Sequence, residues 1–199
     1  YNYAEATGIN SLYCCDGVTD DDSVWARWLC CPQEECDIDL TKRVKEDCQD
    51  HPWHYSIENG GDGGVDIDMC NPQYYDWVTF GIFINNTGDT ELDVTVEDYL
   101  DECLTYEHMT IGPNPNPTSP CLTWDLNTIQ PGQSVYLEYV ASWTESPNCP
   151  CDQKYYNHAE ATGINPLNCC GGVTDDDSVW ARWLCCPQEE CDIDLTKRV

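Results

Sequence analysis

Apolar and polar side chains alternate along most of this chain, and the alternation predicts β-strands rather than helices. Successive side chains of a strand point to opposite faces, so each apolar set marks the face that turns inward. In residues 76–86 that face comprises Val78, Phe80, Ile82 and Ile84. The strands predicted in this way are residues 36–44, 76–86, 92–100, 121–129, 134–143, 157–164 and 173–184.

Two segments lack the alternation. Residues 45–72 contain a glycine-rich, acidic stretch, and we interpret them as a long loop or insertion. Residues 111–121 are rich in proline, which has no N–H for a sheet ladder and is excluded from central strands. Gly88 and the Pro131-Gly132 pair indicate tight turns. About seven short strands in roughly 150 residues predict an all-β fold, an immunoglobulin-like two-sheet β-sandwich.

The end of the chain repeats its beginning almost letter for letter. Tyr1 aligns with Tyr156, so the period is 156 − 1 = 155 residues. The two copies differ only at Tyr3/His158, Ser11/Pro166, Tyr13/Asn168 and Asp16/Gly171. A fixed period is the signature of a repeat array. We therefore interpret the chain as one period plus part of the next, and we expect the natural chain to begin before residue 1.

The charge balance restricts the partners. The chain has 8 Lys+Arg against 37 Asp+Glu, a net charge of −29. Phosphate groups would be repelled, so nucleic acid and anionic membranes are excluded as partners. No apolar run approaches the ~20 residues that a membrane-spanning helix needs. The acidity suits divalent cations or a solvated extracellular surface, and both interpretations stay open.

Cysteine is abundant, which indicates an oxidising compartment and an extracellular or cell-surface location. One period, residues 1–155, holds eleven cysteines, an odd number. The remaining one is free, modified, or paired laterally with another chain, and a free buried thiol is favoured over lateral pairing. The candidates for disulfides are Cys14, Cys15, Cys30, Cys31, Cys36, Cys48, Cys70, Cys103, Cys121, Cys149, Cys151, Cys169, Cys170, Cys185, Cys186 and Cys191.

Two alternatives concern how these cysteines are used. Cys103 and Cys121 flank the proline-rich segment, and we predict that they pair, although spacing alone does not fix connectivity. The Cys14-Cys15 and Cys30-Cys31 pairs, with Cys36, would also suit a zinc or iron–sulfur site. Their spacing matches no C-x-x-C pair, and disulfides are favoured.

The order of the motifs resembles a known family. DLTK (39–42), VTFGIFINNTGDTELDVTVEDYL (78–100) and LTWDLNTIQPGQSVYLEYVASW (122–143) are followed by NHAEATG (157–163) and VTDDDSVWARW (173–183). This series is similar to the immunoglobulin-like conserved-repeat domain of bacterial and archaeal surface proteins, domain of unknown function eleven. In that family DLTK opens the first strand, and the last two motifs form the final two strands.

The resemblance implies a domain frame. Residues 36–184 would form one complete β-sandwich repeat. Residues 1–35 would be the last strands of the preceding repeat, and residues 185–199 a linker and the first strand of the next. The cysteine-rich segment 185–191 would then be a short, disulfide-stapled linker, which makes an array stiff.

These features lead to two functional hypotheses. The first is a non-enzymatic structural subunit of an extracellular filament or surface fibre, whose partners are copies of itself arranged head to tail. The filament is either one covalent array or an assembly in which terminal fragments complement neighbours by strand addition. The alternative is a multivalent surface adhesin that binds carbohydrate or a host protein. A fibre would bury its aromatic side chains between repeats, whereas an adhesin would expose a patch of them.

Several candidate sites accompany these hypotheses. Asn85 begins the sequon Asn85-Asn86-Thr87 and is a candidate for a covalent glycan. The segment 117–120 is a candidate for O-glycans. Calcium is the candidate cofactor, held by the carboxylates of two acidic runs together with Asp62, Asp66 and Asp68, although a solvated acidic turn explains the runs as well. The acidic runs are Asp20, Asp21 and Asp22 with their copies Asp175, Asp176 and Asp177.

No motif indicates catalysis. The four histidines are scattered and lack a nucleophile partner, and neither a G-x-S-x-G, an H-E-x-x-H nor a P-loop sequence occurs. Tryptophan side chains can stack on sugars, but we expect Trp77, Trp124, Trp143 and Trp180 in the core or in contacts between repeats.

Overall fold

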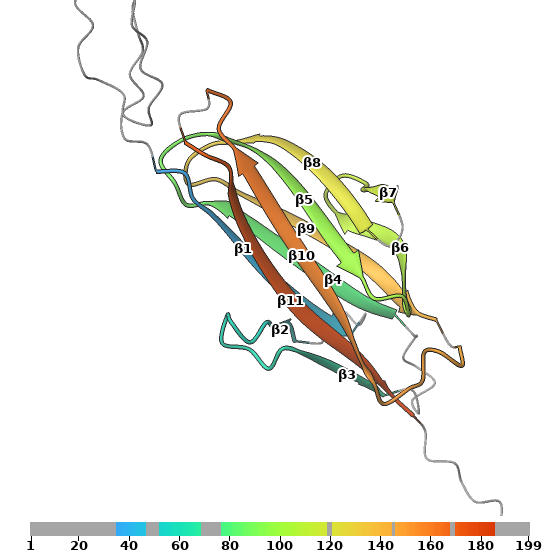
Figure 1. Ribbon diagram of the computed structural model, residues 1–199. Coiled ribbons are helices and arrows are strands. Elements are labelled where there is room, and N and C mark those ends of the chain that lie inside the picture. The colour runs from blue at the N-terminus through green and yellow to red at the C-terminus, as the bar shows by residue number, and fades with distance from the viewer. Residues whose placement is uncertain are drawn as a thin grey trace, which may run out of the picture.

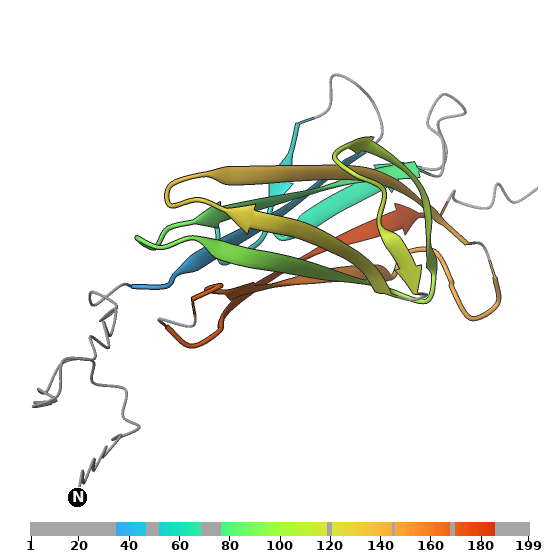
Figure 2. The same cartoon turned by 90° about the horizontal axis from the view of Figure 1, so that it is seen from above.

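The computed structural model describes residues 35–46, 52–68, 77–118, 121–144, 146–167 and 170–185. These residues form two β-sheets that face each other (Figures 1 and 2). The five-stranded sheet runs in the order β2 (His54–Tyr55), β1 (Ile38–Glu46), β4 (Trp77–Asn86), β9 (Ser134–Trp143), β6 (Leu104–Ile111). The six-stranded sheet runs in the order β3 (Gly64–Asp68), β11 (Val173–Leu184), β10 (Lys154–Ile164), β5 (Leu92–Leu100), β8 (Cys121–Ile129), β7 (Asn116–Thr118). The predicted all-β, immunoglobulin-like two-sheet β-sandwich is confirmed.

The predicted inward faces build the core. Val78, Phe80, Ile82 and Ile84 of β4 are all fully buried. The alternating sets of β1 and β9 turn inward beside them in the same sheet, and the set of β5 turns inward from the facing sheet, so that the inner side chains of the two sheets meet between the layers. Burial of this apolar surface is the dominant favourable contribution to folding. All seven predicted strands are present, with bounds that differ by at most three residues.

The prediction that residues 45–72 form a long loop is wrong in part. It contains β2 and β3, and β3 pairs with β11 in parallel, with Val65 opposite Ala181. These strands are short, so they carry too few alternations to be recognised. Strand β6 was missed as well, because most of its side chains are exposed at a sheet edge. The proline-rich segment contains β7, which lies at the edge of its sheet, where Pro117 is tolerated.

Strands β1 and β11 join the two sheets along one side of the sandwich. Asp175 and Asp177 of β11 accept hydrogen bonds from the main-chain N–H groups of Leu40 and Lys42, at 2.6 and 2.7 Å. The two acidic side chains thus satisfy edge groups of β1 that no neighbouring strand covers. Strand β1 starts at one end of the long axis and β11 finishes at the other (Figure 1).

Aromatic side chains divide between core and surface. Trp124, Trp143 and Trp183 are buried, and the rings of Trp143 and Trp183 stack at 6.0 Å. Trp77 is 37% exposed and so lies outside the core, while its predicted place in a contact between repeats stays a prediction. Trp180 is half-buried, with the Lys154 ammonium 3.9 Å above its ring. Nowhere in the described ranges is there a helix long and apolar enough to cross a membrane.

Candidate functional site

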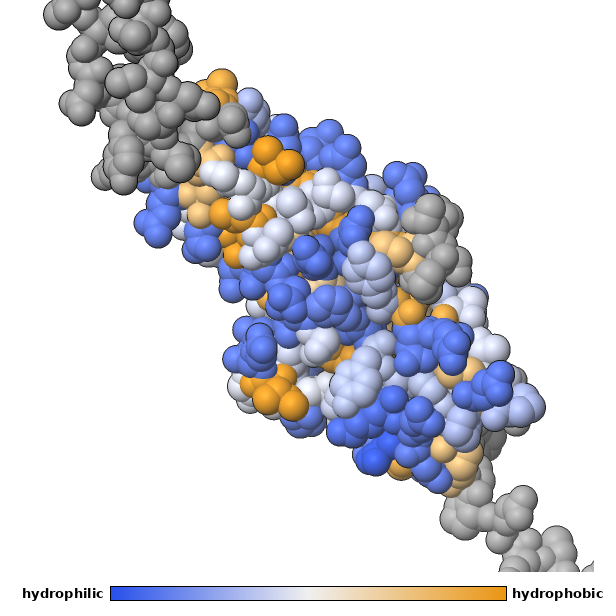
Figure 3. Space-filling model, viewed as in Figure 1, coloured by the Kyte–Doolittle hydropathy of each residue, from blue (hydrophilic) through white to orange (hydrophobic). Residues whose placement is uncertain are grey.

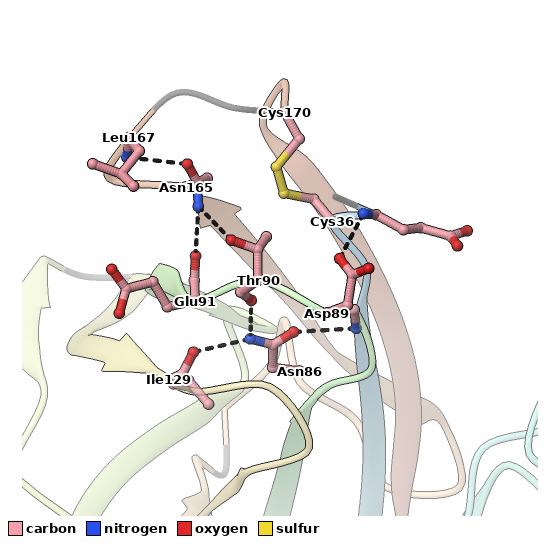
Figure 4. Close-up of a disulfide and its surroundings, with 11 residues drawn as sticks. Cys36, Asn86, Asp89, Thr90, Glu91, Ile129, Asn165, Leu167 and Cys170 are labelled. Atoms are coloured by element: carbon pink, nitrogen blue, oxygen red, sulfur yellow. Dashed lines mark hydrogen bonds between the residues drawn. A yellow bond between two sulfur atoms is a disulfide. The ribbon is translucent and has the colours of Figure 1, made fainter. Parts of the chain in front are cut away.

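The start of β1 is fastened to the hairpin between β10 and β11, an arrangement we call the β1 clamp. Cys36 and Cys170 form a disulfide with their Cα atoms 6.1 Å apart, and 134 residues separate them in sequence (Figure 4). The bond therefore closes nearly the whole sandwich into one covalent loop. A disulfide that closes so long a loop restricts the unfolded chain strongly.

The turn between β4 and β5 holds the segment that leads into β1. The N–H groups of Thr87 and Gly88 donate to the carbonyl of Asp37, both at 3.2 Å, and Asp89 N–H donates to the carbonyl of Glu35 at 3.0 Å. The Glu35 N–H in turn donates to the Asp89 carboxylate at 2.7 Å. Gly88 is required here, because a Cβ atom would lie 2.4 Å from the Glu35 carbonyl oxygen.

Two buried asparagines hold together the loops at the end of the sandwich where β1 starts. The Asn86 amide donates to the carbonyls of Thr90 and Ile129, at 2.8 and 2.9 Å, so it connects both ends of the turn with the end of β8 (Figure 4). The Asn165 amide donates to the Thr90 hydroxyl at 2.7 Å from the β10 side. Side-chain amides thus replace main-chain pairing where the strands end.

The far end of the sandwich carries a second fastening, the β11 clamp. Cys151 and Cys185 form a disulfide that ties the residue after β11 to the connection between β9 and β10. The Asp152 carboxylate also accepts the Cys185 N–H at 3.0 Å. Close by, Cys103 pairs with Cys149, so the predicted pairing of Cys103 with Cys121 is wrong. The chain folds Cys149 back onto the connection after β5, whereas Cys121 lies at the start of β8.

A polar cluster lies in the middle of the apolar core, and we call it the inter-sheet cluster. It consists of Lys42 on β1, Asp98 on β5, Tyr139 on β9 and Asn157 on β10, all with fully buried side chains. The Lys42 ammonium lies 2.7 Å from Asp98 Oδ2, and the Tyr139 hydroxyl donates to the same oxygen at 2.8 Å. The Asn157 amide donates to the Tyr139 hydroxyl at 2.7 Å.

The electrostatics of the inter-sheet cluster follow from its burial. Burial lowers the pKa of Lys42, and the facing Asp98 only partly opposes this. Burial next to Asp98 raises the pKa of Tyr139 well above its usual range. Asp98 Oδ1 and Asn157 Oδ1 are buried acceptors without a hydrogen-bond partner in the described structure. Each such acceptor lowers the stability of the fold by about 1–3 kcal/mol, so the cluster is unusually destabilising for a protein core.

Sequence reasoning missed the inter-sheet cluster. Lys42 lies between Leu40 and Val44 in the inward phase of β1, and Asp98 lies in the inward phase of β5. The signal was a polar residue in the apolar phase of a strand. A polar residue in that phase can be a hydrogen-bonded core residue or part of a functional site. The packing of the two sheets against each other is needed to distinguish the two.

The predicted calcium ligands are distributed over several environments. Asp175 and Asp177 lie in β11 and accept main-chain hydrogen bonds of β1, whereas Asp176 is 67% exposed. Asp62 pairs with His54, and Asp66 binds the Arg182 guanidinium through both oxygens at 2.7 Å. Across the described residues, the potential ligand atoms that come together belong to Cys151, Asp152 and Cys185, and both cysteines are in a disulfide.

The remaining candidates are the glycosylation residue Asn85 and the residues that lie outside the described ranges. Asn85 lies near the end of β4, is half-buried, and accepts a hydrogen bond from Ser134 at 3.1 Å. Asp20, Asp21 and Asp22 lie outside the described residues. The same is true of Cys14, Cys15, Cys30, Cys31, Cys48, Cys70, Cys169, Cys186 and Cys191.

An aromatic group surrounds Arg43 on the outer face of the five-stranded sheet. The Arg43 guanidinium lies 4.1 Å from the Trp53 ring centre and 4.8 Å from that of Tyr136. Phe83 and Tyr55 at its border are 42% and 40% exposed. Gly81 leaves room for this stacking, because a Cβ atom there would lie 2.7 Å from the Tyr136 hydroxyl. The view in Figure 3, by contrast, is mostly hydrophilic with scattered apolar residues.

No protein-family model and no curated protein matches the chain. Solved structures with a similar arrangement are distant. The major pilin subunit BcpA of Bacillus cereus is 13% identical, with a TM-score of 0.48, over 73% of this chain and 40% of that one. The collagen-binding subdomain of the Enterococcus faecalis surface protein ACE is 9% identical, with a TM-score of 0.38, over 60% and 93%. The E. coli chaperone DraB is 19% identical, with a TM-score of 0.33, over 60% and 52%.

The chain thus matches less than half the length of the pilin subunit. At this distance the likenesses do not indicate what the chain does.

Proposed function

We propose that this chain is a non-catalytic structural subunit of an extracellular head-to-tail filament, in which the sandwich acts as an inextensible link. The observation that carries the proposal is the covalent path through the domain. Tension that arrives at Cys36 crosses the disulfide to Cys170, follows β11, and leaves at Cys185. The residues between Cys36 and Cys170 lie outside this path.

The path changes how far the domain can lengthen. Without any disulfide, 185 − 36 = 149 residues separate its two ends, or about 500 Å of extended chain. With the clamp closed, 185 − 170 = 15 residues remain, or about 50 Å. Most of those residues already form the extended strand β11. A folded domain and an unfolded domain would therefore have nearly the same length under tension.

The repeat extends this path from one domain to the next. Cys191 is the copy of Cys36 one period later, since 36 + 155 = 191. Only five residues, 186–190, stand between Cys185 and that copy. In an array built on the frame 36–184, tension would pass through one strand, one disulfide and one short linker per repeat. This regularity supports a covalent array over strand donation.

Single-molecule force spectroscopy tests the load path directly. The chain is held before residue 35 and after residue 185 without reductant. We expect almost no gain in contour length for the wild type. The Cys36→Ser/Cys170→Ser variant should release (103 − 36) + (151 − 149) = 69 residues, up to about 230 Å, because the other two disulfides still shorten the path.

The matched control removes a disulfide that lies off the path. The Cys103→Ser/Cys149→Ser variant should remain as short as the wild type, since Cys103 and Cys149 lie inside the closed loop. Release of more than about 100 Å from the oxidised wild type would refute the inextensible link.

A second candidate function is adhesion, and the aromatic group around Arg43 favours it. Trp53, Tyr55, Phe83 and Tyr136 present rings on one outer face, and rings of this kind can stack on sugars. The Arg43 guanidinium already lies over two of these rings, those of Trp53 and Tyr136. Binding to a glycan array that is lost in a Phe83→Ala/Tyr55→Ala variant would support the adhesin. Equal signals for the wild type and the variant would leave the filament as the better account.

A further inference from the structure

The connection between β10 and β11 exposes apolar side chains at the end of the sandwich where β1 starts. Leu167 is 74% exposed and Ile164 is 55% exposed, and the exposed Pro166 lies between them in sequence. We call these three residues the apolar tip. Apolar residues scattered singly over a surface need no explanation, whereas neighbouring ones at one end of a domain point to a contact.

Hydrogen bonds hold the apolar tip in one position. The Leu167 N–H donates to Asn165 Oδ1 at 3.0 Å. The buried Asn165 amide donates to the Thr90 hydroxyl at 2.7 Å and to the Glu91 carbonyl at 3.1 Å. Figure 4 shows Asn165 between Leu167 and these two residues. The exposed apolar groups therefore stand on a fixed support, which reduces the entropy lost when they bind a partner.

The copy of this segment at the beginning of the chain keeps the apolar side chains while their neighbours change. The copies of Ile164 and Leu167 are Ile9 and Leu12. Three of the four positions that differ between the two copies, namely 166, 168 and 171, lie within the tip or shortly after it. The core does not need the exposed side chain of Leu167, so a contact outside the domain accounts for its presence in both copies.

The opposite end of the sandwich carries exposed proline rings on a loop that is also fixed. Pro147 and Pro150 lie in the connection between β9 and β10 and are exposed. The residues on both sides of Pro150 form disulfides, with Cys103 and with Cys185. We call residues 147–150 the proline loop. In Figure 1 this loop follows β9 and the apolar tip follows β10, at opposite ends of the long axis, so a tip cannot reach the loop of its own domain.

The linker of the proposed array brings these two surfaces together. Cys185 ends one domain and Cys191, the copy of Cys36, begins the next, so 191 − 185 = 6 peptide units join them over at most about 20 Å. The β11 clamp keeps the proline loop beside the start of this linker, because the Cα atoms of its two cysteines are 5.3 Å apart. The β1 clamp keeps the apolar tip of the next domain beside its end, since Leu167 lies three residues from Cys170.

We propose that the apolar tip of each repeat packs on the proline loop of the preceding repeat, so that the junction resists bending. The inference rests on the proposed filament and names the contact between its repeats. A contact of this size would not hold two separate chains together, because specific interfaces bury about 1,200–2,000 Å². The short linker makes the contact intramolecular, with an effective concentration of about millimolar, and a small apolar surface then suffices.

Photo-cross-linking in a two-repeat chain tests the contact. Residues 1–155 are placed before the 199-residue chain, so that two complete sandwiches share one junction. With p-benzoylphenylalanine in place of Leu167 in the second sandwich, irradiation should join the tip to residues 147–150 of the first. The matched control carries the same group in place of Ile57, which is 72% exposed on the connection between β2 and β3, and should give no link between sandwiches. A product of twice the chain mass, links confined to the second sandwich, or no product at all would overturn the proposal.

Small-angle X-ray scattering of the same two-repeat chain tests the effect of the contact on bending. The wild type should fit one fixed arrangement of its two sandwiches. Leu167→Asp in the second sandwich should widen the range of arrangements, because a carboxylate is unfavourable in an apolar contact, whereas Ile57→Asp should not. Circular dichroism reports whether each variant is folded.

A wild type as flexible as the Leu167→Asp variant would overturn the contact. The load path of the proposed function would survive that result, because it depends on the disulfides and is measured as a change in contour length.

Discussion

At the scale of single residues, the inter-sheet cluster is the least expected feature of this sandwich. Its members occupy inward positions that an apolar side chain would fill at no electrostatic penalty. Lys42 and Asp98 have no exposed side-chain surface, so their charges are desolvated and depend on one another. Loss of either partner should therefore matter more than loss of an exposed ion pair.

Replacement of Lys42 by methionine should lower the free energy of unfolding by about 3–5 kcal/mol, because the Asp98 carboxylate would be left buried without its counter-charge. Urea denaturation with the disulfides intact measures this. The double variant Lys42→Met/Asp98→Leu should recover part of the loss, since it removes both charged groups. A single variant as stable as the wild type would show that the pair is not needed.

Alkaline pH should destabilise the fold through Tyr139. Its pKa is raised well above the usual value by burial next to Asp98, so the unfolded chain loses the phenol proton first. The stabilising contribution is complete below pH ~10 and falls by up to about 1.4 kcal/mol per pH unit above it. Urea titrations across this range, with thiols blocked, should show a shallower decline for Tyr139→Phe. Equal slopes would contradict this assignment.

At the scale of elements, the contact between β1 and β11 depends on alternate residues of one acidic run. Asp177 is buried and accepts the Lys42 N–H, whereas its neighbour Asp176 points outward. Asp177→Ala should cost about 1–3 kcal/mol, because it leaves a buried N–H group without a partner. Asp176→Ala should change stability by less than about 0.5 kcal/mol. Thermal denaturation of the two variants, measured in parallel, tests this difference. Equal losses of stability would contradict the role of Asp177 in the contact between β1 and β11.

The strands also differ in how well the sequence predicts them. Long strands with apolar alternation, such as β4 and β5, were predicted with accurate bounds because both contribute a full inward face to the core. Strands β2, β3 and β6 lie at sheet edges or are too short, so tertiary pairing rather than pattern defines them. The partner of Cys103 could not be found, because spacing does not say which loops meet at one end of a sandwich.

The candidate site was less predictable than the fold. Alternation identifies the phase of Lys42, Asp98 and Asn157 along their strands, but their meeting point depends on how two sheets are stacked. The acidic run 175–177 was interpreted as a calcium site or a solvated turn. Its alternate residues instead serve the main chain of β1, a role that becomes visible only with β1 and β11 side by side.

At the scale of the whole molecule, the two clamps turn an ordinary sandwich into a link between fixed points. Cys36 precedes β1 and Cys185 follows β11, and β1 starts at the opposite end of the long axis from where β11 finishes (Figure 1). A head-to-tail arrangement of such links propagates without closure, as a filament requires. The net charge of −29 keeps such a surface solvated.

Cryo-electron microscopy of the native material without reduction tests the filament most directly. We predict a continuous fibre with one sandwich for every 155 residues and peptide density through residues 186–190 from each domain to the next. Isolated particles, or beads joined at variable angles, would contradict the filament.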